Sequence, residues 1–211
     1  MNILIEKNIR VPMRDGVHLA TDVYRLADGG PYPTLIMRTP YNKEAPGALN
    51  GNFDLLRVVQ AGYAIVAQDC RGRFGSDGEF DPIFQEANDG ADCAIWVAGQ
   101  PWCNGRLGTF GSSYLGTTQW LAAPTFPAQV LAMSPAVTPG NIYADLSYRG
   151  GALQIGSMLF WNTMMAIGEQ QRRVPQGRAT LAAMARSAMM REARKVSRRW
   201  MRYTSELKRV R

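Results

Sequence analysis

The sequence predicts an α/β fold built on a largely parallel sheet. Short apolar segments typical of buried strands alternate along the chain with segments of helical periodicity. This alternation favours a parallel sheet with crossover helices on both faces. The composition, 46% hydrophobic and 19% charged over 211 residues, is that of an ordinary globular domain with one sizeable core.

The elements follow in order from the N-terminus. Residues 2–26 predict two strands joined by a turn at Arg14-Asp15-Gly16. The elements predicted after them are a strand at 34–37, a helix at 53–61, a strand at 63–69, a helix at 84–99, a strand at 107–111, a helix at 113–123 and a strand at 129–134. One face of the helix at 84–99 carries Phe84, Ala87, Ala91, Ala94, Ile95 and Ala98.

Several classes of protein are excluded or disfavoured. No run approaches ~18 consecutive apolar residues, so no membrane span is expected. Cys70, Cys93 and Cys103 lack metal-ligand spacing, so we expect buried thiols, no metal and no disulfide framework. Charges at Glu6 and Lys7 come too early for a secretory signal, and a cytoplasmic location is expected.

The basic charge is confined to the C-terminal part of the sequence. Residues 1–168 carry 11 Lys and Arg against 14 Asp and Glu, whereas residues 169–211 carry 13 against 3. Apolar residues from Met189 to Val210 recur at alternating spacings of four and three, which predicts an amphipathic helix. Three interpretations stay open: a helix packed on the domain, a truncated or frame-shifted end, and a binder of anionic surfaces. No motif supports nucleic-acid binding.

The most informative motif is Gly111-Ser112-Ser113-Tyr114-Leu115-Gly116, which joins a predicted strand to a predicted helix. A serine in such a sharp turn needs small neighbours, and its hydroxyl stands exposed above the sheet. The helix N-terminus beneath it favours the negative charge that develops during acyl transfer. On the motif alone, an ordinary Gly/Ser-rich turn remains the alternative.

Further blocks extend the pattern in a fixed order. They are residues 11–19 with 22–24, residues 38–43, residues 68–73 with 75–80, residues 86–92, Trp96, residues 100–105 and residues 111–116. Together they resemble the CocE/NonD-like hydrolases, the cocaine esterase and Xaa-Pro dipeptidyl-peptidase group, over about residues 5–165. The resemblance implies an α/β-hydrolase core with an incomplete, mostly parallel sheet. The domains implied are a core at 1–148, the start of a helical cap at 149–178, and a basic amphipathic tail of uncertain origin at 179–211.

The resemblance also implies roles for three residues. Ser113 matches the nucleophile, which forms an acyl-enzyme with an ester, an amide or a short peptide. The backbone N–H of Tyr114 and the hydroxyl of Tyr41 match the two donors of the oxyanion hole. No cofactor or metal is implied. Without the resemblance, Tyr41 would be taken as a strand-end residue packed under a loop.

The base and acid of a catalytic triad are not found in the sequence. In this fold class they follow the serine, but the single histidine, His18, lies 95 residues before Ser113 and is expected on a strand surface. The carboxylates that follow are Asp145, Glu169, Glu192 and Glu206. We therefore expect an N-terminal portion of a longer hydrolase, inactive alone and prone to self-association through an unpaired strand. The alternative is a non-catalytic remnant or binding module that contacts a partner through its basic helix.

The earlier acidic residues have structural explanations in the sequence. Asp69 is expected to pair with Arg71 and order the glycine-rich loop. Asp77, Glu79 and Asp81 are expected as solvated loop charges. Asp89 and Asp92 are expected on a helix surface.

Overall fold

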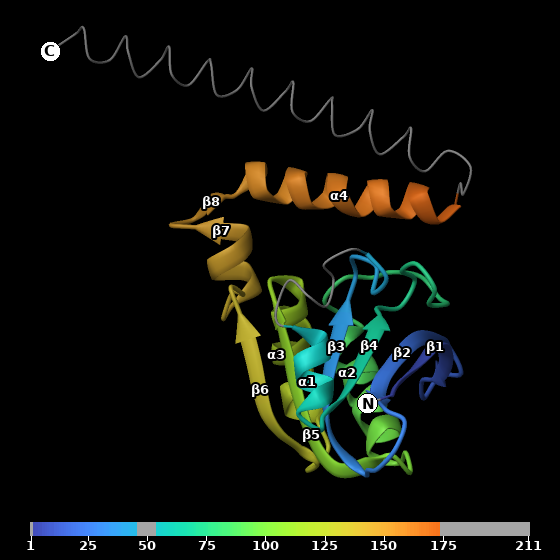
Figure 1. The fold of residues 1–211 in the computed structure, drawn as a ribbon. Helices are drawn as coiled ribbons and strands as arrows, with labels where there is room; N and C mark the ends of the chain where they lie inside the picture. The colour runs from blue at the N-terminus through green and yellow to red at the C-terminus, as the bar shows by residue number, and fades with distance from the viewer. Residues whose placement is uncertain (1, 46–53, 174–211) are drawn as a thin grey trace, which may run out of the picture. The chain divides into compact units, whose positions relative to one another are not determined.

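The computed structural model describes residues 2–45 and 54–173 (Figure 1). The elements of the sheet and its helices are β1 (Ile3–Pro12), β2 (His18–Leu26), β3 (Tyr32–Thr39), α1 (Leu55–Gln60), β4 (Ala64–Asp69), α2 (Glu86–Ala98), β5 (Cys103–Ser112), α3 (Tyr114–Ala122) and β6 (Val130–Ala136). After them come a π-helical turn (Ile142–Ser147), the short strands β7 (Tyr148–Arg149) and β8 (Ala152–Leu153), and α4 (Ile155–Arg173). The predicted order of strands and helices is thus confirmed, while the π-helical turn, β7 and β8 were not predicted.

Six strands form one mixed sheet in the order β1-β2-β4-β3-β5-β6. Strands β4, β3, β5 and β6 are parallel, and the hairpin of β1 and β2 adds two antiparallel strands at one edge. The prediction of a mostly parallel sheet is therefore confirmed. Because parallel strands end at the same edge, the carboxyl ends of β3, β4, β5 and β6 and the loops that follow them lie along one side, uppermost in Figure 1.

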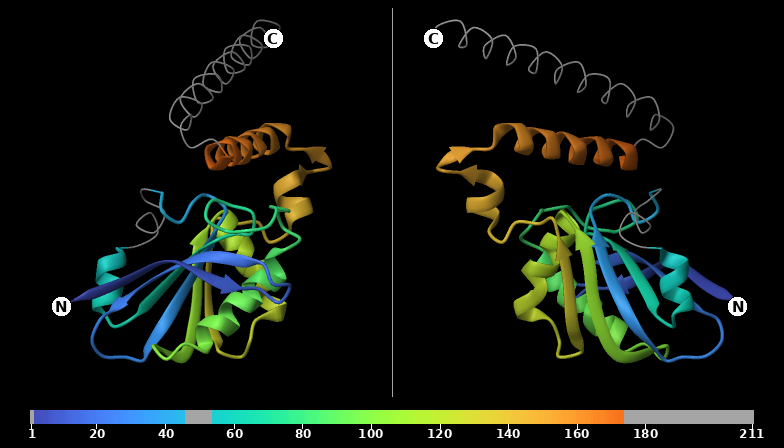
Figure 2. Two further views of the ribbon diagram at one scale, coloured as in Figure 1. Left: turned by 90° about the vertical axis from the view of Figure 1, so that its right-hand side faces the viewer. Right: turned by 60° about the vertical axis from the view of Figure 1, so that its left-hand side comes forward.

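Helices cover both faces of the sheet (Figure 2). One core cluster packs α2 residues such as Val97 against Ile36 and Val66 of the sheet. A second cluster packs Val59 of α1 against Met37 and Ile65, the neighbours of those two strand residues. Successive strand residues point to opposite faces, so the middle of each of these two strands, 35–37 in β3 and 64–67 in β4, is apolar on both sides.

The helix α2 buries a face that matches its apolar pattern only in part, since Ala91 and Ala94 are buried as predicted. Phe84 and Ile95 are exposed by 81% and 56%, whereas Glu86 and Asp89 are each 2% exposed. The expectation that Asp89 lies on the helix surface was therefore wrong. The physical reason is charge compensation, because arginines from other elements meet both carboxylates inside the protein.

The expected pair of Asp69 with Arg71 was also wrong. Arg71 instead pairs with Asp89 at 2.6 Å and with Asp15 at 2.7 Å. The carboxylate of Asp69 accepts hydrogen bonds from the backbone N–H groups of Lys43 and Gly75. Asp92 is largely covered by Arg14, which contacts it at 2.8 Å.

The three cysteines are buried free thiols, as predicted. Among the described residues, no helix is both long and apolar enough to cross a membrane. The chain divides into two compact units, Met1–Phe160 and Trp161–Arg211, with the division inside α4. The proposed boundaries at 148 and 178 stay predictions, and the basic segment 179–211 lies outside the described residues.

Candidate active site

Ser113 occupies a strained turn between β5 and α3. Its backbone angles are φ +57° and ψ −126°, a conformation that residues other than glycine rarely adopt. Its N–H donates to the carbonyl of Ala136 at 2.9 Å, and its own carbonyl accepts from the N–H groups of Gly116 and Thr117 at 2.9 and 3.0 Å. The end of β6 and the first turn of α3 therefore hold the strained residue from both sides.

The two glycines that flank Ser113 are required by close packing. A Cβ on Gly111, which has φ +140°, would lie 2.5 Å from the Cβ of Leu115. A Cβ on Gly116 would lie 2.7 Å from the side chain of Thr138, in the loop after β6. The sequence motif thus has the physical basis that its small residues suggested. Residues 111–116 form a strand-turn-helix bend, here called the elbow, in which larger side chains would clash.

Backbone strain gathers at the edge where Ser113 lies. The described residues other than glycine with positive φ include Asn42 after β3, Phe74 and Ile83 after β4, Ser113 after β5 and Val137 after β6. Such conformations cost on the order of 1–3 kcal/mol each and persist where the surrounding structure enforces them. They mark the carboxyl ends of the parallel strands as the candidate active site, the usual location in open α/β sheets.

Tyr41 lies at this same edge, just after β3. Because β3 and β5 are adjacent and parallel, the turn that carries Tyr41 and the turn that carries Ser113 leave neighbouring strands in the same direction. The Tyr41 N–H donates to Thr39 Oγ1 at 3.1 Å, and Arg73 Nε donates to the carbonyl of Pro40 at 3.0 Å. The structure therefore brings Tyr41 and Ser113 to adjacent loops of one site.

Lys43 anchors the far end of the Tyr41 turn with buried charge. Its Nζ, on a side chain 1% exposed, lies 2.7 Å from Asp22 Oδ1 and donates to Asn8 Oδ1 at 2.8 Å. Its N–H donates to Asp69 Oδ1 at 2.8 Å, and Gly75 N–H donates to Asp69 Oδ2 at 3.2 Å. Burial raises the pKa of Asp69 to about 6, although both backbone hydrogen bonds act to lower it.

The side chain of Tyr114 points into the protein and is 6% exposed. Its hydroxyl donates to Glu86 Oε1 at 3.1 Å and accepts the N–H of Ile83 at 2.9 Å. Burial, with the charge of Glu86 beside it, raises the pKa of the Tyr114 hydroxyl far above its ordinary value. The hydroxyl is therefore a fixed neutral contact at physiological pH. Only the backbone of Tyr114 remains available to the candidate site.

His18 lies on a strand that is distant from Ser113 in the sheet. It is the first residue of β2, which is three strands away from β5. Three inter-strand spacings amount to about 14 Å, which exceeds the reach of a hydrogen bond between a histidine and Ser113. The side chain of His18 is partly exposed, and the backbone carbonyl of His18 accepts the N–H of Asp77 at 3.0 Å.

The carboxylates downstream of Ser113 are engaged locally. Asp145 accepts the N–H of Asn141 at 2.8 Å in the π-helical turn. Glu169 lies 3.9 Å from Arg172 in α4. Glu192 and Glu206 fall outside the described residues. Across residues 2–45 and 54–173, no cluster of three His, Cys, Asp or Glu side chains could hold a metal ion.

Comparison with known proteins assigns the family. The model of the X-Pro dipeptidyl-peptidase (S15) family matches residues 15–209. The chain belongs to this family. It is 41% identical over 169 residues to the cocaine esterase of Rhodococcus sp. (strain MB1 Bresler), covering 79% of this chain and 29% of that relative. The CocE/NonD-like resemblance predicted from the sequence is thereby confirmed, and the chain spans less than a third of this curated relative.

Solved structures show the same relationship. The chain is similar to a CocE/NonD family hydrolase from Staphylococcus aureus, with a TM-score of 0.70 at 28% identity over 81% of this chain and 34% of that one. It is also similar to an α-amino acid ester hydrolase, with a TM-score of 0.59 at 26% identity over 74% of this chain and 29% of that one. The prediction of an α/β-hydrolase core is therefore confirmed. The prediction that the chain belongs to a family of hydrolases is confirmed as well.

The sequence did not reveal the residues that support the site. Lys43 and Glu86 lie inside blocks that carry the family resemblance, but their buried roles depend on partners 21 and 28 residues away. Neither charge is conspicuous in the sequence, because Lys43 stands between Asn42 and Glu44 and Glu86 follows Gln85. Burial of each charge beside its partner became evident only in three dimensions.

Proposed function

We propose that this chain carries the nucleophile and oxyanion hole of a serine hydrolase that acts on acyl esters, amides or short peptides. The observation that carries the proposal is the strained, tightly packed elbow at Ser113. Its Oγ attacks the carbonyl carbon of the substrate, and the leaving alcohol or amine departs as an acyl-enzyme forms. Water then releases the acid in the second half of the reaction.

Two donors would stabilise the oxyanion that forms on attack. The N–H of Tyr114 lies at the N-terminus of α3, where the helix dipole favours negative charge. The hydroxyl of Tyr41 would approach from the adjacent turn after β3. Each such donor contributes roughly 3 kcal/mol to the stabilisation of the transition state in comparable sites. Tyr41 and Tyr114 thus supply electrostatic stabilisation without taking a proton.

The triad is proposed to be incomplete in this chain. Ser113 needs a base to accept its proton, and that base needs a carboxylate to orient it. The single histidine is three strands away, and the chain spans 29% of the length of the Rhodococcus cocaine esterase. We propose that the triad Asp and His belong to sequence not present here, and that the isolated chain turns over little or no substrate.

The names of the relatives support the substrate class. They include a cocaine esterase, an X-Pro dipeptidyl-peptidase family and an α-amino acid ester hydrolase. All three names imply cleavage next to an acyl carbonyl. We also propose a cytoplasmic location, because buried free thiols are typical of proteins in reducing compartments.

A fluorescent fluorophosphonate tests the proposed state of the site. The reagent labels a serine that is activated by a base, and exposure alone does not suffice. We expect the folded 211-residue chain to remain unlabelled, like its Ser113→Ala variant. Labelling that disappears in Ser113→Ala would show that a base is supplied and would contradict the incomplete triad.

Self-association is proposed from the outer edge of β6. This strand ends the sheet, has no strand on its outer side among the described residues, and carries no charged residue from Val130 to Ala136. Leu131 is 61% exposed there. An uncharged apolar edge favours pairing between copies. Sedimentation velocity should show oligomers that Leu131→Lys reduces, and a monodisperse wild-type monomer would contradict the proposal.

The alternative remains a remnant or binding module that acts through the basic segment 179–211. Its charge is the feature that favours it. Binding to anionic vesicles that is lost on removing this segment, together with an elbow that never labels when a base is provided, would favour this alternative.

A further inference from the structure

A buried carboxylate connects the elbow to the strand that leads to Tyr41. Glu86 is the first residue of α2 and is 2% exposed. Its Oε1 accepts the Tyr114 hydroxyl at 3.1 Å, and its Oε2 accepts Arg38 Nη1 at 2.6 Å. One side chain therefore joins the residue after the nucleophile to β3, three residues before Tyr41.

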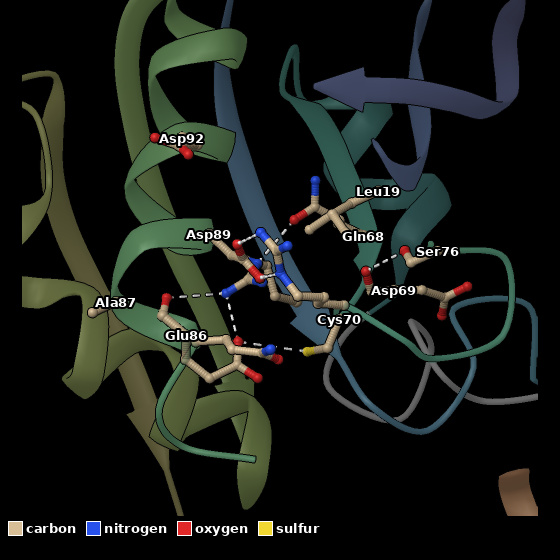
Figure 3. Close-up of polar contacts among 12 residues, drawn as sticks. Leu19, Gln68, Asp69, Cys70, Ser76, Glu86, Ala87, Asp89 and Asp92 are labelled. Atoms are coloured by element: carbon tan, nitrogen blue, oxygen red, sulfur yellow. Dashed lines mark hydrogen bonds and ion pairs between the residues drawn. The ribbon is translucent and has the colours of Figure 1, made fainter. Parts of the chain in front are cut away.

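The surroundings of Glu86 fix it in one position. Arg38 Nη1 also donates to the backbone carbonyl of Glu86 at 3.3 Å, and Arg38 Nε donates to Gln68 Oε1 at 2.9 Å. Cys70 Sγ approaches Glu86 Oε2 at 3.7 Å. Figure 3 shows Glu86 and Asp89 extending from α2 toward Gln68 and Cys70 at the end of β4. A carboxylate with this many partners is held rigidly.

The Tyr114 hydroxyl connects the fixed Glu86 carboxylate to the backbone of the loop after β4. It also accepts the N–H of Ile83, a β-branched residue at φ +79° in the loop after β4. The Tyr114 ring packs against Phe80, with ring centroids 6.1 Å apart, and Arg73 lies over the Phe80 ring at 5.2 Å. Arg73 in turn holds the carbonyl of Pro40. The loops after β3, β4 and β5 are thus linked through one phenol.

We infer that Glu86 is a positioning residue for the oxyanion hole, which sets the Tyr114 backbone relative to the Tyr41 turn through the Tyr114 hydroxyl. The inference rests on the proposed function. Glu86 contacts no reacting atom, because its two oxygens are taken by Tyr114 and Arg38 inside the protein. A hole made from two separate loops needs such a link, since displacement of about 1 Å is costly in catalysis.

The test uses the full 211-residue chain and three variants: Glu86→Gln, Tyr114→Phe and the control Tyr32→Phe. Tyr32 is 7% exposed and donates from its hydroxyl to the carbonyl of Asp28 at 2.6 Å, at the opposite end of β3. The control thus removes a buried tyrosine hydroxyl far from the site. Tyr114→Phe keeps the ring and the charge pair, so it remains informative if Glu86→Gln fails to fold.

Two readouts separate positioning from general stability. Hydrogen exchange should become roughly tenfold faster in peptides covering 112–118 and 39–43 in both site variants, the expected loss of one hydrogen bond to a charged group. An oxyanion hole without its triad still accelerates ester hydrolysis by ~10³ over water. Residual hydrolysis of p-nitrophenyl acetate should therefore show a roughly tenfold lower kcat with KM unchanged.

The outcomes are distinguishable. Faster exchange confined to these two peptides, absent in Tyr32→Phe, supports the positioning role. Exchange that is unchanged, or that rises equally throughout the chain, overturns it whatever the hydrolysis rate. A wild-type chain that hydrolyses the ester no faster than buffer is what the incomplete triad allows, and the exchange data then decide the positioning role alone. The proposed function is tested separately by fluorophosphonate labelling, so the two failures are distinguishable.

Discussion

The elbow after β5 and the turn after β3 lie side by side but are held in place by different forces. Ser113 is held by steric packing, with Gly111 and Gly116 in positions where a Cβ would clash at 2.5 and 2.7 Å. The Tyr41 turn is held by buried charge, chiefly Lys43 with Asp22 and Asp69. The difference explains why local sequence predicts the elbow at Ser113 but not the turn that carries Tyr41.

Packing constraints at the elbow are more local than charge constraints at the Tyr41 turn. Both glycines lie within three residues of Ser113, and Gly111 meets Leu115 inside the motif, whereas Gly116 meets Thr138 after β6. Lys43 acts through Asp22 on β2 and Asp69 at the end of β4, and no spacing rule connects these positions. The comparison predicts that the two loops will respond differently to small and to charge-changing substitutions.

The largest expected effect is the loss of the buried pair under the Tyr41 turn. Lys43→Met leaves the Asp22 carboxylate, 0% exposed, without its cation. We expect a loss of about 3–5 kcal/mol in the free energy of unfolding, measured by urea titration.

The matched control for this change is Lys7→Met. Lys7 pairs with Glu44 at 2.7 Å, but the two side chains are 49% and 44% exposed. An exposed pair contributes about 1 kcal/mol or less. Equal losses in the two variants would show that buried charge does not hold the turn.

A smaller effect is expected at the elbow. Gly116→Ala places a Cβ against Thr138 and should cost about 1–3 kcal/mol by overpacking. The control Gly156→Ala adds the same methyl near the start of α4, where no atom lies within 4 Å. There the substitution should be neutral or stabilising by up to about 1 kcal/mol. If both glycines tolerated alanine equally in thermal unfolding, close packing would not explain the motif.

The smallest expected effect is a pH dependence from Asp69. Its folded pKa of about 6 lies above the ordinary value of 3.8, so the folded state binds the proton more tightly. The resulting stabilisation, roughly 3 kcal/mol in full, is present below about pH 4 and is lost as pH rises through 6, with roughly 2 kcal/mol of the loss falling between pH 4 and pH 7. Stability relative to Asp69→Asn should therefore fall between pH 4 and pH 7.

The comparison with Asp69→Asn isolates this group. The pKa values of Asp15, Glu44 and Asp92 are lowered by their Arg or Lys partners, or by hydrogen bonds to them, and those carboxylates act in the opposite direction at lower pH in both proteins. Relative stability that instead rises with pH would show that the two backbone hydrogen bonds outweigh burial.

The same distinction determines how much of the molecule the sequence predicted. The predicted strands contain runs, 35–37 and 63–67, that are continuously apolar because both sheet faces are covered, so the fold and strand order were predictable. The face of α2 was not, because Glu86 and Asp89 are buried beside Arg38 and Arg71 from elsewhere. Apolar periodicity identifies helices and strands but carries no information on which charges are paired in the interior.

The candidate site divides in the same way. Ser113 followed from its neighbours, whereas the roles of Tyr41 and Tyr114 came from the family resemblance and remain proposals. The hydrogen bond between Glu86 and Tyr114 spans 28 residues and joins two elements that only the tertiary fold brings together. No motif within either segment could have indicated it.

The central claim is that Ser113 is a competent nucleophile that lacks its base. It is tested most directly by a chimaera in which the matched segment of about 169 residues replaces its counterpart in the Rhodococcus cocaine esterase. Fluorophosphonate should label this chimaera, and Ser113→Ala within it should abolish the label, while the 211-residue chain stays unlabelled. A folded chimaera that does not label at Ser113 would contradict the account.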